Sequence, residues 1–196
     1  MFTDPQLIIN NDGEAVYYPL VFNTVEAQKL LTELLQNIEW QHDEVIMFGK
    51  QITTKRKVAW YAGEGISYTY AGKRKDPLSW SPLLLSIKEI VEKQTGATYN
   101  ACLLNLYHAG DEGMSWHRDN EKEIVPESSI ASVSFGAPRK FAFKHAATAQ
   151  KIELMLDAGS VLDMRGPIQQ HWYHALPASK KVKALRVNLT FRLLIK

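Results

Sequence analysis

Residues 186–192 read Arg-Val-Asn-Leu-Thr-Phe-Arg, so polar and apolar side chains alternate strictly along this segment. Successive side chains of a β-strand point to opposite faces, so the four polar residues share one face and the three apolar residues share the other. Two arginines on one face of a core strand require anions. Their guanidinium groups match carboxylates in bidentate geometry, so the face could hold a dicarboxylate or a phosphate. Alternatively, Arg186 and Arg192 pair with acidic residues of the protein at a sheet surface.

The same period of two predicts further strands throughout the chain after Gly96. Runs rich in apolar and β-branched residues, separated by Gly, Pro and Asp turns, cover 98–107, 130–135, 141–145, 152–156, 160–164 and 184–195. Six or more strands without intervening helices predict a β-sandwich or barrel.

Two helices are predicted before these strands. Asn23 can cap the first helix, Glu26 follows three residues later, and leucine and isoleucine recur at helical spacing as far as Ile38. The second helix begins at Ser81-Pro82, where a capping residue precedes a proline. We therefore expect one α+β, mainly β domain, with both helices on the outside of one sheet.

The composition excludes several classes of protein. With 45% apolar and 22% charged residues among 196, the chain is neither disordered nor fibrous. Its single cysteine, Cys102, excludes an internal disulfide and a multi-cysteine metal site, and we expect this thiol to lie in the core of a protein from a reducing compartment. The N-terminus lacks the pattern of a signal peptide, and no apolar run approaches the ~18 residues of a membrane span, so no membrane is expected.

Charge is distributed unevenly along the chain. Residues 1–49 hold one lysine and eight acidic residues, whereas residues 50–196 hold 22 basic and 13 acidic residues. The basic residues form three clusters: Lys50, Lys55, Arg56 and Lys57; Lys73, Arg74 and Lys75; and Lys180, Lys181 and Lys183. On one face they would attract a polyanion, although each cluster alone is also typical of a solvated loop.

A metal site is indicated by His117-Arg-Asp119, which places an imidazole and a carboxylate side by side. A later histidine would complete the set of two histidines and one carboxylate that non-haem Fe(II) oxygenases use. His171 and His174 are both candidates, and the residues alone do not choose between them. A structural zinc site would need a fourth protein ligand that the sequence does not clearly offer.

Five motifs in this order resemble one known family. They are Asn105-Leu-Tyr107, His117-Arg-Asp119, IASVSFG at 130–136, His174-Ala-Leu-Pro and the alternating segment 186–192. Over roughly residues 45–196 the chain resembles the AlkB family of Fe(II)- and 2-oxoglutarate-dependent dioxygenases, most closely the branch that repairs alkylated bases in DNA. The resemblance implies a double-stranded β-helix, which is a variant of the jelly roll and agrees with the predicted strands.

The resemblance also assigns residues. It implies that iron is held by His117, Asp119 and His174, the last because a small residue, a hydrophobic residue and proline follow it. It implies a pocket for 2-oxoglutarate formed by Asn105, Tyr107, Arg186, Asn188, Thr190 and Arg192. Arg192 and Asn105 would hold the carboxylate near the metal, and Arg186 and Tyr107 the distal one. Each arginine of the last strand would then have its anion.

The implied reaction consumes Fe(II)-bound 2-oxoglutarate and O2. It releases succinate and CO2, hydroxylates an alkyl carbon on a base nitrogen, and frees formaldehyde and the repaired base. A base in a duplex must be flipped out to reach such a site. By resemblance, Tyr70 stacks on that base opposite His117, Tyr68 and Glu121 contact its edge, and Phe48 fills the gap left in the duplex.

These observations predict a single dioxygenase domain over 1–196, with an acidic extension and helix at 1–44, a nucleotide-recognition region at 45–80 and a jelly-roll core at 97–196. The expected partner is DNA carrying alkylated bases, single- or double-stranded. We expect a monomer, cytoplasmic in a bacterium and nuclear in a eukaryote. The alternatives are a dioxygenase of the same fold acting on RNA or protein, and a binding module for alkylated or distorted DNA without turnover.

Overall fold

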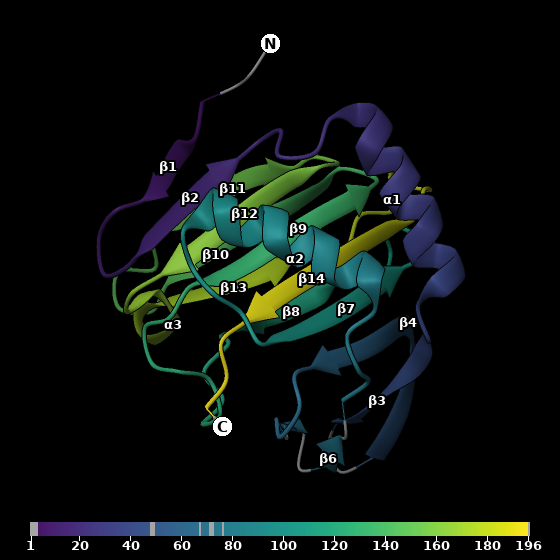
Figure 1. Cartoon of the computed structure of the whole chain (residues 1–196). Coiled ribbons are helices and arrows are strands. Elements are labelled where there is room, and N and C mark those ends of the chain that lie inside the picture. The colour runs from purple at the N-terminus through teal and green to yellow at the C-terminus, as the bar shows by residue number, and fades with distance from the viewer. Residues whose placement is uncertain (1–3, 48–49, 67, 71–72, 76, 196) are drawn as a thin grey trace.

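The computed structural model describes residues 4–47, 50–66, 68–70, 73–75 and 77–195. Three antiparallel sheets form within them (Figure 1). The large sheet has the order β1-β2-β12-β9-β14-β7-β4-β3 and consists of β1 (Gln6–Ile9), β2 (Glu14–Tyr18), β3 (Gln41–Met47), β4 (Lys50–Ala62), β7 (Ala101–Tyr107), β9 (Ile130–Gly136), β12 (Ser160–Arg165) and β14 (Arg186–Arg192). The four-stranded sheet has the order β11-β10-β13-β8 and consists of β8 (Met114–His117), β10 (Arg139–His145), β11 (Lys151–Leu156) and β13 (Trp172–Leu176). A hairpin of β5 (Tyr68–Tyr70) and β6 (Lys73–Lys75) forms the third.

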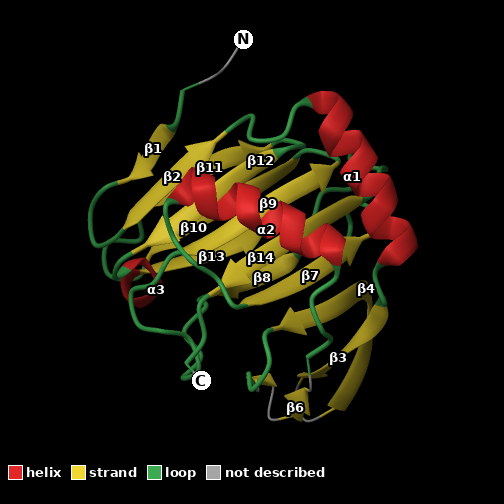
Figure 2. Ribbon diagram, in the orientation of Figure 1, coloured by secondary structure: helices red, strands yellow, loops and turns green. Residues whose placement is uncertain are grey.

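Two long helices cover the outer face of the large sheet, as predicted (Figure 2). The Asn23 side chain accepts from the backbone of Val25 and Glu26 and so begins α1 (Thr24–Asn37) in a complete capping box. Ser81 caps α2 (Pro82–Thr95), which ends at Gly96 in the left-handed conformation. Among the described helices, none is long and apolar enough to cross a membrane.

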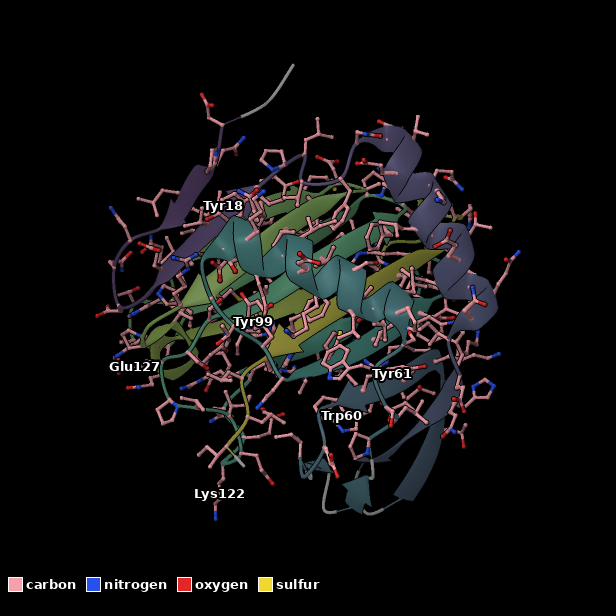
Figure 3. All side chains as sticks on the ribbon, in the orientation of Figure 1. Tyr18, Trp60, Tyr61, Tyr99, Lys122 and Glu127 are labelled. Carbon is pink, nitrogen blue, oxygen red and sulfur yellow. The ribbon has the colours of Figure 1, made fainter. Side chains whose placement is uncertain are left out.

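The large sheet separates two apolar layers. On its outer face Val187, Leu189 and Phe191 of β14 pack with residues of both long helices, and the aromatic residues Tyr61 and Tyr99 belong to this layer (Figure 3). On its inner face a second layer fills the space toward the four-stranded sheet, with Phe143, Trp172 and Leu176 among its members. The alternation of β14 therefore directs its apolar row to the helices and its polar row into the molecule. All seven residues of this strand are buried.

The strands predicted after Gly96 are confirmed, with ends shifted by a few residues. Two strands that carry histidines of the proposed metal site, β8 and β13, lie outside the predicted runs. In β13 four of five residues are buried, so buried and exposed positions do not alternate there. A short helix, α3 (Ile168–His171), precedes β13 directly. Cys102 is fully buried, as expected.

Gly159 is expected to tolerate no side chain. Its φ is +81°, and a Cβ there would lie 2.2 Å from the Phe22 carbonyl oxygen. We expect Gly159→Ala to lower the free energy of unfolding by more than the about 1–2 kcal/mol of a left-handed alanine, because the backbone must also move. Gly65 is the matched control: its φ is +80° and nothing lies within 4 Å of its added Cβ. Thermal unfolding of both alanine variants measures the difference, and equal losses would contradict the close approach at Gly159.

Candidate active site

His117, Asp119 and His174 meet in the pocket between the large and the four-stranded sheet. His174 of β13 is the direct cross-strand partner of His117 of β8, so strand pairing alone brings the two imidazoles together. Their Nε2 atoms lie 3.7 Å and 3.8 Å from the same Asp119 oxygen, Oδ1. One potential ligand atom of each residue lies within 4.8 Å of the others, which makes the group a site that can hold iron.

Both histidines are prepared to bind a cation. The Ser115 carbonyl lies 2.8 Å from His117 Nδ1, and because a carbonyl only accepts, Nδ1 carries the proton and Nε2 keeps its lone pair. Burial lowers the pKa of His174 to about 3, although the charge of Asp119 opposes this shift. The imidazole of His174 is therefore neutral at physiological pH, which is the form that coordinates metals.

Asp119 is held as a carboxylate. Burial alone would raise its pKa, but Arg192, His174 and His117 outweigh burial and lower the pKa to about 2. Arg192 Nη2 donates to Asp119 Oδ2 at 2.6 Å. The backbone N–H of Asp119 donates to Gln169 Oε1 at 2.9 Å. The carboxylate is thus ionised and fixed in place, with Oδ1 directed at the two histidines.

A pocket of about 250 Å³ extends from this group along the inner face of the large sheet. Its apolar wall includes Leu103, Met114, Phe141, Met164 and Leu176. Its polar wall includes every residue that the resemblance assigned to 2-oxoglutarate: Asn105, Tyr107, Arg186, Asn188, Thr190 and Arg192. Strand register explains this gathering, because Arg186 of β14 faces Tyr107 of β7 and Asn188 faces Asn105.

Arg186 shows that the pocket is built for an anion. It is 2% exposed, and among the described residues no carboxylate forms an ion pair with it. Its guanidinium donates to Ser134 Oγ at 2.9 Å and lies 5.6 Å from the centre of the Tyr107 ring, while its Nε has no hydrogen-bond partner within the described part of the chain. Burial lowers the pKa of Arg186 to about 10. A buried cation without a counter-charge fits a pocket that receives a carboxylate.

The two arginines of β14 therefore have different surroundings. Arg192 is already paired with Asp119 beside the metal site, whereas Arg186 lacks a carboxylate partner among the described residues. The Asn105 side chain lines the pocket, and its Oδ1 has no hydrogen-bond partner within the described residues. An asparagine amide can present either its oxygen or its NH2 group, so this end can serve a ligand. The polar wall thus fits a dicarboxylate such as 2-oxoglutarate.

Residues that the sequence analysis left without a role support this wall. Ser132 Oγ accepts from Asn188 Nδ2 at 2.8 Å, and Thr190 Oγ1 donates to Asn188 Oδ1 at 3.1 Å. Ser134 Oγ accepts a hydrogen bond from Arg186. The two serines alternate in β9, in the segment IASVSFG, and this alternation was the signal that could have assigned them. Gln169 gave no comparable signal.

His171 lies apart from the pocket, three residues before His174 and on α3. Of the two histidines left open by the residues alone, the structure brings His174 to Asp119. Glu121 lines the pocket near the metal site. Phe48 lies outside the described residues, and Tyr68 and Tyr70 are described only as the backbone of β5.

Arg56 corrects one prediction from the charge pattern. Its place in the sequence groups it with lysines that attract phosphates, yet Arg56 is 7% exposed and paired with the buried Asp43. Strand alternation is the reason, since Arg56 lies on the inward face of β4, where its Nη1 also reaches Met114 Sδ at 3.3 Å. Its neighbour Lys55 faces solvent, as do Lys180, Lys181 and Lys183.

Comparisons with known proteins agree with this site. The family model of the 2OG-Fe(II) oxygenase superfamily matches residues 14–192. The chain is similar to the mouse protein named "DNA oxidative demethylase ALKBH2", with 41% identity in an alignment of length 192 that covers 92% of this chain and 80% of that protein. It is also 31% identical to human "Alpha-ketoglutarate-dependent dioxygenase alkB homolog 3" in an alignment of length 223, which covers 98% of this chain and 77% of the relative.

A solved structure supports the fold. The structure of OsALKBH1 aligns with a TM-score of 0.65 at 14% identity and covers 96% of this chain and 100% of the solved chain. The predicted jelly roll is thereby confirmed. Fold and site define a non-haem Fe(II) oxygenase that uses 2-oxoglutarate. Within that superfamily, the chain belongs to the AlkB family of dioxygenases.

Proposed function

We propose that this protein repairs DNA directly, by oxidative removal of alkyl groups from base nitrogens such as those of 1-methyladenine and 3-methylcytosine. The observation that carries the proposal is one pocket that joins a His-Asp-His group to a buried arginine without a carboxylate partner among the described residues. Relatives of 40% identity named as DNA oxidative demethylases support DNA as the substrate.

The proposed ligands of Fe(II) are His117, Asp119 and His174. Bound iron with 2-oxoglutarate and O2 supplies the oxidation of the alkyl carbon, which releases succinate, CO2 and formaldehyde. Arg192 keeps Asp119 ionised, and the Ser115 carbonyl keeps His117 in the coordinating tautomer. The protein's own task is to hold these groups rigid and to leave positions open at the metal.

The proposed cosubstrate contacts use the polar wall of the pocket. Arg186 and Tyr107 hold the distal carboxylate of 2-oxoglutarate, and Arg192 and Asn105 hold the carboxylate nearest the metal. Asn188, which donates to Ser132 and accepts from Thr190, supports the wall between these ends together with Thr190. The apolar wall excludes water from the reacting carbon.

Base recognition is proposed for the mouth of the pocket. Glu121, which lines it, contacts the edge of the flipped base, and Tyr68 joins it there. Tyr70 stacks on the base opposite His117, whose side chain is 36% exposed. The exposed lysines Lys55, Lys180, Lys181 and Lys183 are candidates to contact phosphates.

A direct assay tests the function. Protein loaded anaerobically with Fe(II) and 2-oxoglutarate is given O2 and oligonucleotides carrying 1-methyladenine or 3-methylcytosine, and base mass and succinate are followed together. We expect one methyl group lost for each succinate formed. Succinate coupled to demethylation of RNA or of a protein alone would replace DNA as the substrate, and binding without succinate would leave a binding module.

Phe48 provides a prediction about strand preference. If it fills the gap left by a flipped base, Phe48→Ala lowers the rate on a duplex by more than the rate on a single strand, because only the duplex must stay open. Paired initial rates on both forms of one oligonucleotide measure this ratio. An equal loss on both forms would remove Phe48 from this role.

A further inference from the structure

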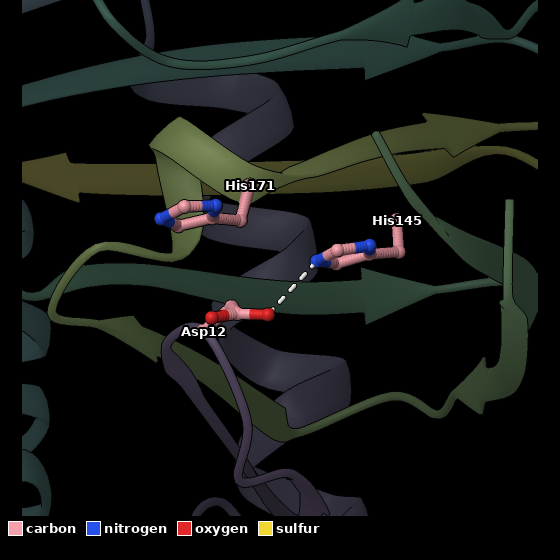
Figure 4. Close-up of side chains that lie close together, drawn as sticks. All are labelled: Asp12, His145 and His171. Atoms are coloured by element: carbon pink, nitrogen blue, oxygen red, sulfur yellow. Dashed lines mark hydrogen bonds and ion pairs between the residues drawn. The ribbon is translucent and has the colours of Figure 1, made fainter. Parts of the chain in front are cut away.

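A second group of potential metal ligands lies apart from the active-site pocket. Asp12 is in the turn between β1 and β2, His145 is the last residue of β10, and His171 is the last residue of α3. One potential ligand atom of each lies within 4.8 Å of the others (Figure 4). We propose that these three residues bind a divalent transition-metal ion of the zinc class, at a site separate from the iron.

The donor set and its geometry support this site. His145 Nε2 lies 3.1 Å from Asp12 Oδ2, close to the about 3.3 Å that separates two ligands of a tetrahedral zinc ion. The rings of His145 and His171 are parallel within 6°, with centres 6.2 Å apart, and Figure 4 shows both beside the Asp12 carboxylate. Two imidazoles and one carboxylate suit Zn²⁺, Co²⁺ or Ni²⁺ rather than Mg²⁺ or Ca²⁺, which prefer oxygen ligands.

Burial differs among the three ligands in a way that suits metal entry. His145 is 4% exposed and fixed by an edge contact with Trp172, whose ring centre lies 4.8 Å away. Asp12 is exposed, with 51% of its side chain accessible, and His171 is half-buried. A solvated ion can therefore arrive at Asp12 and His171 and lose water as it reaches His145, with one water completing the tetrahedron.

Thr148 determines where the proton of His145 goes. The backbone N–H of Thr148 donates to His145 Nδ1 at 3.1 Å, so Nε2 carries the proton and donates to Asp12. When a metal ion takes Nε2, the ring proton moves to Nδ1, the Thr148 backbone N–H gives up this acceptor, and Thr148 Oγ1, also 3.1 Å from Nδ1, accepts the proton. Thr148→Val removes this acceptor, and we expect it to weaken the metal by about 10- to 100-fold without removing the site.

The metal would join three segments that are distant in the sequence. Among them, α3 also supports the iron site, because Gln169 Oε1 accepts the Asp119 N–H at 2.9 Å and the Gln170 carbonyl accepts from Arg118 at 2.6 Å. The ion would thus link the β1–β2 turn to α3, the helix that positions an iron ligand. The proposed role of the ion is to stabilise the position of α3.

Cobalt stoichiometry tests the site without any activity measurement. Equilibrium dialysis against Co²⁺ under anaerobic conditions, with visible absorption as a second readout, is expected to give two ions per wild-type chain. Asp12→Asn and His171→Ala are each expected to bind one ion, as is His174→Ala, which disables the iron site. The double variant Asp12→Asn/His174→Ala is expected to bind none.

The substitution of Asp12 by asparagine is expected to preserve the fold. Its φ is 53°, a left-handed conformation that asparagine tolerates well, and the asparagine oxygen can still accept from His145. His108→Ala is the matched control, since His108 also contacts a carboxylate, Glu112 at 3.1 Å, but belongs to neither group of three potential ligands. That variant is expected to bind two ions. Two ions in both Asp12→Asn and His171→Ala, or a single wild-type ion that both variants retain, would overturn the proposal.

Discussion

Replacement of Arg186 by glutamine is expected to raise the 2-oxoglutarate concentration for half-maximal turnover by about 30- to 1,000-fold. The loss of one partner of a buried charge pair costs about 2–4 kcal/mol, and each 1.4 kcal/mol is a factor of ten. Arg186 is 2% exposed, so water cannot replace it in the pocket. Initial rates measured against 2-oxoglutarate, at saturating iron and oligonucleotide, give the ratio.

The free energy of unfolding of Arg186→Gln distinguishes a weaker binding of 2-oxoglutarate from a folding defect. Burial lowers the pKa of Arg186, which means that the folded protein disfavours the guanidinium charge, so its loss is not expected to lower the free energy of unfolding without cosubstrate. Added 2-oxoglutarate stabilises the wild type by mass action, and this stabilisation should disappear in Arg186→Gln.

Arg165→Gln is the matched control for Arg186. Arg165 pairs with the buried Asp163, so its removal is expected to destabilise the fold while the dependence of turnover on 2-oxoglutarate stays unchanged. If Arg186→Gln left that dependence unchanged as well, Arg186 would not belong to the cosubstrate pocket.

The second large effect is expected at His174. His174→Ala should reduce iron-dependent turnover by more than about 100-fold, because even residues that only orient a ligand contribute 10- to 100-fold. Its Nε2 is directed at the Asp119 carboxylate, whereas His171 lies beside His145 in a different part of the molecule. His171→Ala is therefore expected to retain most of the turnover at saturating iron. The reverse result, with His174→Ala active and His171→Ala inactive, would overturn the assignment of the iron ligand.

Strand alternation predicted which polar side chains share a face because it is a local property, whereas only the resemblance to a family joined these faces into one pocket. In the segment 186–192 the faces follow from a period of two, and neighbouring strands with the same pattern supplied Asn105 and Tyr107. Strand alternation also determines the orientation of Arg56, but the charge pattern alone placed this residue at the surface. It was read as part of a charge cluster, although its alternate position in a long strand directs it inward to Asp43.

Contacts between distant segments could not be predicted in this way. The Gln169 side chain and the Asp119 backbone are separated by 50 residues, and the Ser115 carbonyl selects the tautomer of His117 through backbone geometry. Residue types alone did not choose between His171 and His174, because the choice depends on which of them faces His117 across a strand pair. Only the resemblance to a family had made that choice.

The position of β8 has a consequence for how the metal and the fold depend on each other. This strand of four residues lies at the edge of the four-stranded sheet and pairs with β13. One proposed iron ligand, His117, ends this edge strand, and its partner His174 belongs to the interior strand. Bound iron would therefore link β8 to β13 through His117 and His174, and its loss would allow β8 to separate from the sheet edge. Amide hydrogen exchange along Met114–His117 would then report the occupancy of the metal site directly.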